Sequence, residues 1–368
     1  MTAKRSEGFS YAPASSGSPV VRPGEFVYAA AHLDHGHIYG QCAGLTGAGA
    51  TLKWVYDPDA EKVRAFQQQF AGVRAARSLD EILDDNEVRL VASAAVPCER
   101  GPVGCRVMRA GKDYFSDKSP FTTPGQLDEA RKTAAATRRK YMVYYSERLH
   151  VESAWHVDAL LQAGAIGKIV HISITGPHRL SAKNRPAWFF DKKCYGGILT
   201  DIASHQVDQF LHYARADGGV VRHARVANFA HPEHPGLEDF GEAVFELSNG
   251  VSCHSRVDWF TPDGLRTWGD GRTVIVGTAG YLEIRKYVDV GQETPADCIY
   301  LVDGGCEQKI ECKGRVGFPF FGRFIQDCLN RTEQAMTQGH AFMAAELSMQ
   351  AQQIADRAGR RHFGCRLE

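Results

Sequence analysis

The chain has 368 residues, of which 43% are hydrophobic and 23% are charged, a composition typical of folded globular proteins. Lysine plus arginine and aspartate plus glutamate each number 43, so no charge excess favours nucleic acid or an acidic membrane surface as a partner. The length suits two domains, and no apolar run approaches the roughly 20 residues that span a bilayer.

The first 24 residues are rich in serine, proline and glycine, which predicts a disordered tail rather than a signal peptide. Ten cysteines are scattered from Cys42 to Cys365, and none forms a Cys-x-x-Cys pair. This pattern favours reduced thiols in a cytoplasmic protein over a disulfide framework or a zinc knuckle.

Residues 25–147 alternate between short apolar runs and segments with helical spacing. The predicted strands cover residues 26–33, 51–56, 90–95, 114–115 and 141–145. The predicted helices include residues 60–70, a segment that closes at Gly111, and residues 124–137, which Thr123 caps. Repeated strand–helix units of this length predict an α/β fold with a parallel, doubly wound sheet.

Ligands bind such sheets at the carboxyl ends of the strands. There the loop after the first predicted strand holds Asp34, His35, Gly36 and His37, followed by Ile38. A Gly-x-Gly-x-x-Gly fingerprint would need two further glycines before Gly36, so this phosphate loop is degenerate. A helix that begins here still presents backbone N–H groups to a phosphate.

An acidic residue ends the second predicted strand. Asp57 lies 21 residues after Gly36, close to the spacing of the acid that bonds the adenosine ribose of NAD. Pro58 and Asp59 follow it, so no basic residue directly after Asp57 favours the 2′-phosphate of NADP. The sequence therefore favours NAD over NADP.

Residues 148–368 show a different pattern and form the second predicted domain. A helix over residues 150–163 precedes alternating strands and two final helices, residues 321–338 and 342–360. Asn249-Gly250 between two alternating runs predicts a hairpin. The strands lie within residues 169–175, 221–229, 242–247, 251–256, 273–277 and 281–286. They predict an α+β domain with an antiparallel or mixed sheet.

The segment from Gly196 to Asp208 carries the clearest chemical pattern. On a helix that begins near Thr200, Asp201, His205 and Asp208 share one face at i, i+4 and i+7. A histidine beside a carboxylate is suited to proton transfer near neutral pH. The alternative is a buried structural histidine bonded to Asp201.

Two loops carry further polar side chains. The histidines of the loop from His32 to His37 suggest a metal site, but a loop that packs on the dinucleotide is favoured, and no metal is expected. Arg185 and Trp188 precede the glycine pair, and Arg148 follows the last strand of the first domain. Such side chains near a catalytic group suit sugar rings and hydroxyls, so we predict that these three contact the substrate.

From about Gly24 onward the chain resembles the Gfo/Idh/MocA oxidoreductase family. The resemblance rests on an ordered set of landmarks: Gly36, Asp57, Pro97, Asp117-Lys118, and Gly196-Gly197 followed by Asp201, His205 and Asp208. It implies a Rossmann domain followed by an α/β domain whose open sheet often mediates dimer or tetramer contacts. It also implies that Lys118, Asp201 and His205 are catalytic and that Pro97 and Lys118 lie at the cofactor.

The chain departs from the family pattern at three positions. Ser119 replaces the proline that usually follows the lysine, which puts the usual cis peptide in doubt. Cys98 stands where the family often has asparagine, and Gly101 where it often has histidine.

The predicted activity is NAD-dependent oxidation of a secondary alcohol of a sugar, sugar acid or cyclic polyol. In this hypothesis His205 accepts the hydroxyl proton, and Asp201 orients His205 or raises its basicity. Lys118 stabilises the negative charge on the oxygen. Two alternatives stay open: a lyase or glycosidase that retains NAD, and a non-catalytic protein that senses a dinucleotide or a sugar.

Overall fold

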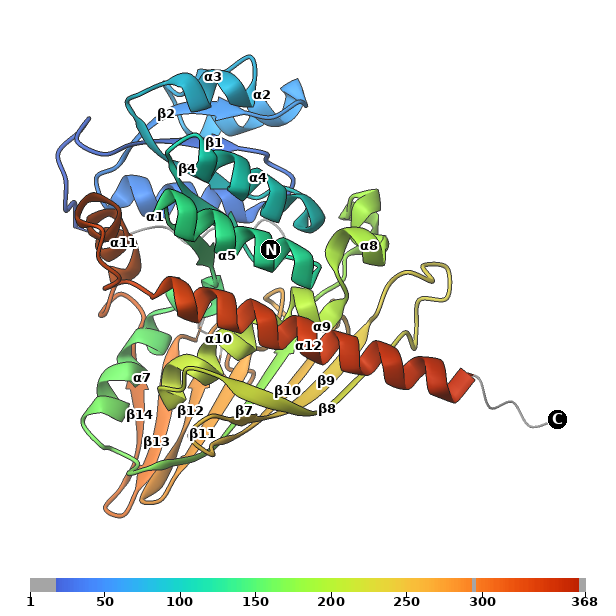
Figure 1. Cartoon of the computed structure of the whole chain (residues 1–368). Coiled ribbons are helices and arrows are strands. Elements are labelled where there is room, and N and C mark those ends of the chain that lie inside the picture. Colours follow the sequence, from blue (N-terminus) through green and yellow to red (C-terminus); the bar gives the residue numbers. More distant parts are fainter. Residues whose placement is uncertain (1–17, 293–295, 364–368) are drawn as a thin grey trace. The chain divides into compact units, whose positions relative to one another are not determined.

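The computed structural model describes residues 18–292 and 296–363, with side chains up to residue 358. The chain forms two compact units, and each is described by itself. Within the described residues, the Rossmann unit holds residues 18–144 and 317–341, and the second unit holds residues 145–316 and the chain from Phe342 onward (Figure 1). Residues 1–17 of the predicted tail lie outside the described residues, whereas Val21 is buried and Val20 donates its N–H to the Ala48 carbonyl.

The Rossmann unit is built on a six-stranded sheet in the order β3-β2-β1-β4-β5-β6. All neighbouring strands pair in parallel. This is the doubly wound order of dinucleotide-binding domains, and the predicted fold class of the first half is confirmed. The strands are β1 (Val27–Ala31), β2 (Thr51–Tyr56), β3 (Arg74–Ala75), β4 (Val88–Ser93), β5 (Asp113–Asp117) and β6 (Tyr141–Tyr144).

The helices of this unit begin where the sequence supplies a cap. Asp59, Ser78 and Thr123 each accept a backbone N–H from the first turn of the helix that follows. One helix is longer than predicted, because it already begins at Pro97 and continues through Pro102. The helices are α1 (His37–Gly47), α2 (Ala60–Gln69), α3 (Leu79–Asp84), α4 (Pro97–Arg109), α5 (Pro124–Thr137) and α11 (Pro319–Asn330).

Helix α11 comes late in the chain but packs on α1, near the start of the Rossmann unit. The contact depends on Gly44, because a Cβ atom there would lie 2.2 Å from the ring of Phe321. Gly44 therefore fulfils a packing role, like the glycine that lets the first helix of a dinucleotide fold lie close to its neighbours.

The second unit is built on an eight-stranded sheet in the order β14-β13-β12-β11-β7-β10-β9-β8. Only β7 and β10 pair in parallel, so the sheet is mixed, as predicted. The predicted hairpin joins β9 and β10 through Gly250, whose φ is 83°. The strands are β7 (Ile169–Pro177), β8 (Gly219–Ala227), β9 (Phe240–Leu247), β10 (Ser252–Asp258), β11 (Arg272–Gly277), β12 (Gly280–Arg285), β13 (Cys298–Asp303) and β14 (Glu307–Glu311).

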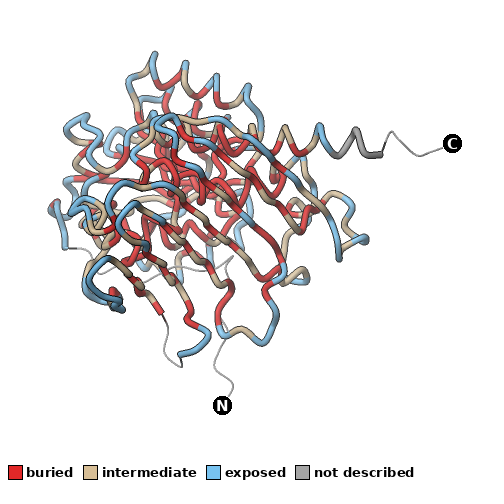
Figure 2. The backbone as a smooth tube through the Cα atoms, turned by 90° about the horizontal axis from the view of Figure 1, so that it is seen from below, coloured by how far each residue is buried: buried red, intermediate tan, exposed pale blue. Residues whose placement is uncertain are grey.

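Alternation of burial along β7 shows which face of this sheet is covered. Ile172 and Ile174 are buried, whereas Ser173 between them is half-buried. In Figure 2 the buried stretches follow the strands, and exposed backbone gathers in the loops. The helices of this unit are α6 (Ser146–Leu149), α7 (Glu152–Gln162), η2 (Ala182–Asn184), η3 (Ala187–Phe190), α8 (Lys192–Tyr195), α9 (Ile198–Asp201), α10 (Ala203–Ala214) and most of α12 (Gln338–Phe363). In the described part of the chain, no helix is both long enough and apolar enough to cross a membrane.

Candidate active site

The predicted cofactor loop lies where the strand order of the Rossmann sheet reverses. Strands β1 and β4 are neighbours, and the loops after them are joined by hydrogen bonds from His35 N to Ala94 O (3.0 Å) and from Ala94 N to His32 O (3.1 Å). Helix α1 then begins at His37, and Ile38 is fully buried beneath the loop. The carboxyl ends of β1 and β4 and the start of α1 therefore form the crevice in which this fold binds a dinucleotide.

The loop turns without the usual glycines. Gly36 is the N-cap of α1 and has an ordinary right-handed conformation, with φ at −61°. The left-handed residue is His32, with φ at 58°. The degenerate fingerprint thus reflects a different turn rather than a missing loop. The residues present fit a dinucleotide at the amino-terminal end of α1.

Asp57 lies at the end of β2, as the spacing predicted. Its Oδ2 accepts Leu33 N at 2.6 Å and its Oδ1 accepts Asp59 N at 2.9 Å, so the carboxylate fixes the cofactor loop. A carboxylate has about four acceptor positions, which leaves capacity for ribose hydroxyls. Lys62 was not predicted to lie at this site. Its Nζ is 2.6 Å from Asp34 Oδ1 and 3.9 Å from Asp57 Oδ1.

A buried carboxylate, Asp117, joins the histidines of the loop to the backbone of Lys118. His37 Nδ1 lies 2.8 Å from Asp117 Oδ1, and Lys118 donates its backbone N–H to the same oxygen at 2.8 Å. Arg100 on α4 donates to Asp117 Oδ2 at 3.0 Å. His35 Nδ1 accepts the His37 N–H at 3.2 Å and lies 3.5 Å from Asp117 Oδ2.

Charge fixes the ionisation of this cluster. Burial would raise the pKa of Asp117, but the charges of His37, Arg100 and His35 outweigh burial and hold that pKa far below its ordinary value. Burial, aided by neighbouring His37, lowers the pKa of His35 well below that of a free histidine. At neutral pH, Asp117 is therefore a carboxylate and His35 is a neutral acceptor.

The donor atoms of His35, His37 and Asp117 lie within 4.8 Å of one another, close enough to hold a metal ion. Both oxygens of Asp117, however, already accept hydrogen bonds, and Arg100 sets a positive charge beside one of them. A cation placed there would meet that guanidinium. We therefore retain the expectation that this cluster positions the loop and holds no metal.

The doubt raised by Ser119 is not borne out, because the peptide bond between Lys118 and Ser119 is cis. Arg100 donates to the carbonyl oxygens of both residues, at 3.2 Å for Ser119. This role of Arg100 was not predictable from the sequence, since an arginine on a helix is normally solvated. Pro97 is the first residue of that helix, and three residues separate it from the end of β4.

In the second unit, Asp201 ends α9 and His205 lies on α10, so the predicted helix is interrupted at Ile202. The glycines before it have left-handed backbones, with φ at 88° for Gly196 and 93° for Gly197. A Cβ atom on Gly197 would lie 2.3 Å from the side chain of Gln352. The glycine pair thus permits close packing on α12.

The third polar residue of the helix face has a structural partner. Asp208 accepts two hydrogen bonds from Arg148, each 2.7 Å long, and both side chains are almost fully buried. A buried bidentate pair of this kind fixes α6 against α10. The geometry therefore favours a structural role for Arg148 over the substrate contact that we predicted.

The carboxylate of Glu147 is a site feature that the sequence missed. It is buried on α6 and bonds Gln206 and Lys286, each at 3.2 Å. His178 Nε2 lies 3.9 Å from its other oxygen, and the charge of His205 acts on it as well. Helix α6 has only four residues, too few for a periodic pattern from which this contact could be predicted.

Arg185 and Trp188 lie in an aromatic cluster of the same unit. The Arg185 guanidinium lies 4.5 Å from the ring centre of Phe189 and 5.1 Å from that of Trp259. Trp188, on η3, is half-buried, and its ring centre lies 5.9 Å from that of Phe189. His178 meets Trp259 edge to face, with ring centres 5.4 Å apart. Aromatic faces and a guanidinium suit a ring that carries hydroxyl groups.

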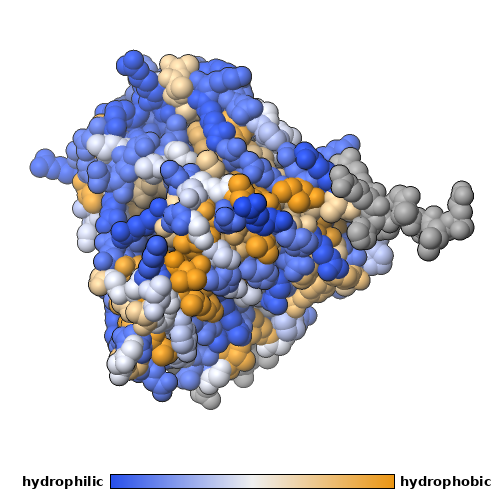
Figure 3. Space-filling view, turned by 60° about the horizontal axis from the view of Figure 1, so that its bottom comes forward, coloured by the Kyte–Doolittle hydropathy of each residue, from blue (hydrophilic) through white to orange (hydrophobic). Residues whose placement is uncertain are grey.

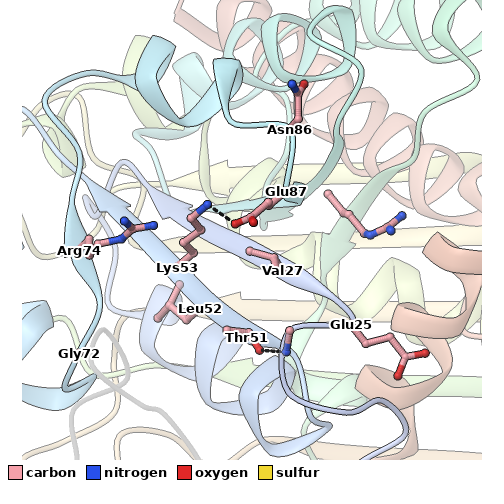
Figure 4. A pocket seen from close by; sticks show the side chains of 11 residues that line it. Glu25, Val27, Thr51, Leu52, Lys53, Gly72, Arg74, Asn86 and Glu87 are labelled. Carbon is pink, nitrogen blue, oxygen red and sulfur yellow. Dashed lines mark hydrogen bonds and ion pairs between the residues drawn. The ribbon is translucent and has the colours of Figure 1, made fainter.

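A cavity of about 610 Å³ lies at the opposite edge of the Rossmann sheet. Figure 4 shows Val27, Thr51 and Arg74 from the amino-terminal ends of β1, β2 and β3, together with the Lys53–Glu87 ion pair. Ligands of parallel sheets bind at the carboxyl ends. This cavity is therefore not the cofactor site.

Both units match models of known families. Residues 32–145 match the oxidoreductase family model of the NAD-binding Rossmann fold, and residues 155–283 match the Gfo/Idh/MocA C-terminal domain. A solved structure of a candidate oxidoreductase from Erwinia carotovora atroseptica is 44% identical, covers 90% of this chain and 99% of that chain, and has a TM-score of 0.88.

Two named dehydrogenases are more distant. Levoglucosan dehydrogenase, solved with NADH and levoglucosan, is 15% identical over 90% of this chain and 97% of that chain, with a TM-score of 0.75, which shows a shared fold. D-xylose dehydrogenase of Paenarthrobacter nicotinovorans is 24% identical over 153 residues, only 39% of this chain and 38% of that enzyme.

The fold, the cofactor crevice and these matches define an NAD-binding oxidoreductase. The chain belongs to the Gfo/Idh/MocA family, and the resemblance inferred from its sequence is confirmed.

Proposed function

We propose that the protein is an NAD-dependent dehydrogenase that oxidises a secondary alcohol of a sugar, sugar acid or cyclic polyol. The observation that supports this most directly is that Lys118 follows β5 while Asp201 and His205 occupy α9 and α10, within a family of NAD-binding oxidoreductases. The names of two relatives, which act on D-xylose and levoglucosan, are consistent with a carbohydrate substrate.

Each side chain has a definite role in this proposal. His205 accepts the proton of the substrate hydroxyl, and Asp201 orients the substrate or the imidazole. The Lys118 ammonium stabilises the negative charge that develops on the same oxygen. Bound NAD supplies the hydride acceptor, held by the loop from Asp34 to Ile38 and by Asp57.

Arg185 and Trp188 are proposed to contact the sugar. The guanidinium donates to hydroxyl groups, and the indole packs on the apolar face of the ring. Because Arg148 is committed to Asp208, we leave it out of this substrate set.

The test is a panel of sugars, sugar acids and inositols, followed by absorbance at the NADH band. Net NADH formation with at least one compound supports the proposal. Substrate consumption with NAD unchanged would indicate the lyase or glycosidase alternative. Saturable NAD or sugar binding with no turnover across the panel would indicate a sensor.

We also propose that copies of the chain associate through the second sheet. Figure 3 shows hydrophobic side chains in small patches among hydrophilic ones. On β11 and β12, Val276 and Tyr281 are directly paired and remain 37% and 46% exposed. Tyr281 is also paired with Val302 on β13, so three apolar side chains adjoin across three strands.

A further inference from the structure

A buried ion pair underlies helix α10, which carries His205. Glu147 and Lys286 have side chains that are 4% and 0% exposed, and Glu147 Oε2 lies 3.2 Å from Lys286 Nζ. Burying two charges costs free energy unless further polar contacts satisfy them. Two of those contacts, made by Gln206 and Gln209, lead to α10.

The first of these contacts is made by Gln206, the residue after His205. Its Nε2 donates to Glu147 Oε2 at 3.2 Å. A glycine makes room for it, because a Cβ atom on Gly176 of β7 would lie 2.7 Å from Gln206 Nε2. The sheet is therefore shaped around this amide.

The second contact reaches the backbone of His205 itself. Lys286 donates to Gln209 Oε1 at 2.7 Å, and Gln209 Nε2 donates to the His205 carbonyl at 2.8 Å. The pair is thus tied to both ends of the helical turn that presents the imidazole. Gln206 and Gln209 are fully buried, so neither bond competes with water.

We propose that Glu147 is a positioning residue that raises the basicity of His205, with Lys286 as its counter-ion. The inference rests on the proposed function, in which His205 is the proton acceptor. A fixed carboxylate near an imidazole favours the protonated ring, and a nearby ammonium opposes it. Glu147 and Lys286 therefore act on His205 with opposite signs.

The charged groups around the pair support this arrangement. Burial would raise the pKa of Glu147, but Lys286, His205 and His178 together lower it to about 2. Burial lowers the pKa of Lys286, although the charges of Glu147, Asp208 and Asp297 oppose that change. Asp208 is itself neutralised by Arg148. Glu147 is therefore ionised throughout the range in which a histidine titrates.

The experiment is an NMR titration of the histidine ring protons in the full-length protein without substrate, with the His205 signal assigned from its loss in His205→Asn. We expect Glu147→Gln to lower the pKa of His205 by about 1, and Lys286→Gln to raise it. The double variant should return His205 close to its original pKa. His178, 3.9 Å from Glu147, should shift in the same directions and reports that the charge was removed.

The matched controls are Arg222→Gln and Glu246→Gln, an exposed ion pair of the same unit that should leave His205 unchanged. A merely structural pair would lower the melting temperature in both single variants and leave the pKa of His205 in place. If one single variant fails to fold, the direction of the pKa shift of His205 in the other single variant still decides the sign of the coupling. If the pKa of His178 shifts in these variants while the pKa of His205 stays in place, the inference is overturned.

The same variants separate this inference from the proposed function. If the enzyme oxidises a sugar, the acidic limb of its kcat/KM profile should move to lower pH in Glu147→Gln and to higher pH in Lys286→Gln. If no substrate is oxidised but the NMR shifts occur, the proposed function fails and the coupling stands. If activity requires His205 and neither its pKa nor the pH profile moves, the coupling fails and the function stands.

Discussion

At the scale of single residues, the candidate site is organised by two buried carboxylates that remain charged. Asp117 is surrounded by Arg100, His37 and a backbone N–H, and Glu147 by Lys286 and Gln206. The sequence marked Asp117 only as a family landmark and did not mark Glu147, because the side chains that partner these carboxylates lie 17 to 139 residues away along the chain. Asp117 bonds the backbone of Lys118, and Glu147 bonds the residue after His205, so each carboxylate adjoins one side chain that we propose to be catalytic.

Replacement of Lys118 or His205 by alanine tests the catalytic assignment. We expect each to lower kcat by roughly 10²–10⁴-fold, the scale of general acid–base and oxyanion contributions. NAD affinity should change far less in His205→Ala, since α10 belongs to the second unit. Turnover and melting temperature are measured on the same samples.

The controls are Lys132→Ala and His223→Ala, at exposed positions. A stable His205→Ala protein with normal turnover would mean that the proton goes elsewhere. A marked loss of melting temperature with normal activity per folded molecule would assign His205 to the core instead.

Asp57 tests the choice of cofactor. We expect NAD to bind more tightly than NADP, and Asp57→Ser to narrow the difference by roughly 1–3 kcal/mol. The serine removes the charge that repels a 2′-phosphate and leaves Lys62 nearby to meet it. Calorimetric titration with both cofactors measures the change.

Glu61→Gln, which removes an exposed charge four residues away, is the control for that experiment. NADP binding as tight as NAD in the unmodified protein would contradict the assignment of Asp57.

At the scale of elements, the segment around the glycine pair shows how a loop fixes a helix. Glu238 accepts the N–H of Ile198 at 2.9 Å, and Gln352 accepts that of Leu199 at 3.0 Å. Two of the unsatisfied N–H groups at the start of α9 are thereby bonded. Gly197 permits this only because it has no Cβ atom.

Gly197→Ala should therefore lower the free energy of unfolding by more than about 2 kcal/mol. It combines a left-handed backbone, which costs about 1–2 kcal/mol with a side chain, with a contact of 2.3 Å to Gln352. Gly250→Ala is the matched control, since its φ is also positive but the space around it is open. Denaturant unfolding of both variants separates the two costs, and equal losses would contradict the packing role.

The strands of both sheets were largely predictable from the sequence because apolar runs and alternation are local signals. The missed elements were short or polar: α3, β13 and β14 were not predicted, and no start was predicted for α4, which begins at Pro97. The order of motifs nominated Lys118, Asp201 and His205 as catalytic residues, which stays a prediction. It could not show that Arg148 pairs with Asp208, because that contact depends on tertiary packing over 60 residues.

At the scale of the whole molecule, chain order and spatial grouping differ. The segment of residues 317–341 follows the second sheet in sequence but belongs to the Rossmann unit. There Arg331 pairs with Asp113 at the start of β5, and Phe320 and Phe324 contact Phe115. A truncation after the second sheet would therefore expose part of the Rossmann core.

Association through the second sheet gives the last prediction. Val276, Tyr281 and Val302 adjoin on β11, β12 and β13, and burial of such a cluster between two copies would supply apolar area at the centre of an interface. We expect the unmodified protein to sediment as a dimer or tetramer, and Tyr281→Lys to shift it toward smaller species, because the charge would be buried without a partner. Val290→Glu is the control, since Val290 is 59% exposed in a turn outside the strands. Sedimentation velocity over a range of concentrations measures both variants. A monomer at all concentrations, or an assembly insensitive to Tyr281→Lys and Val276→Glu, would exclude this face as the interface.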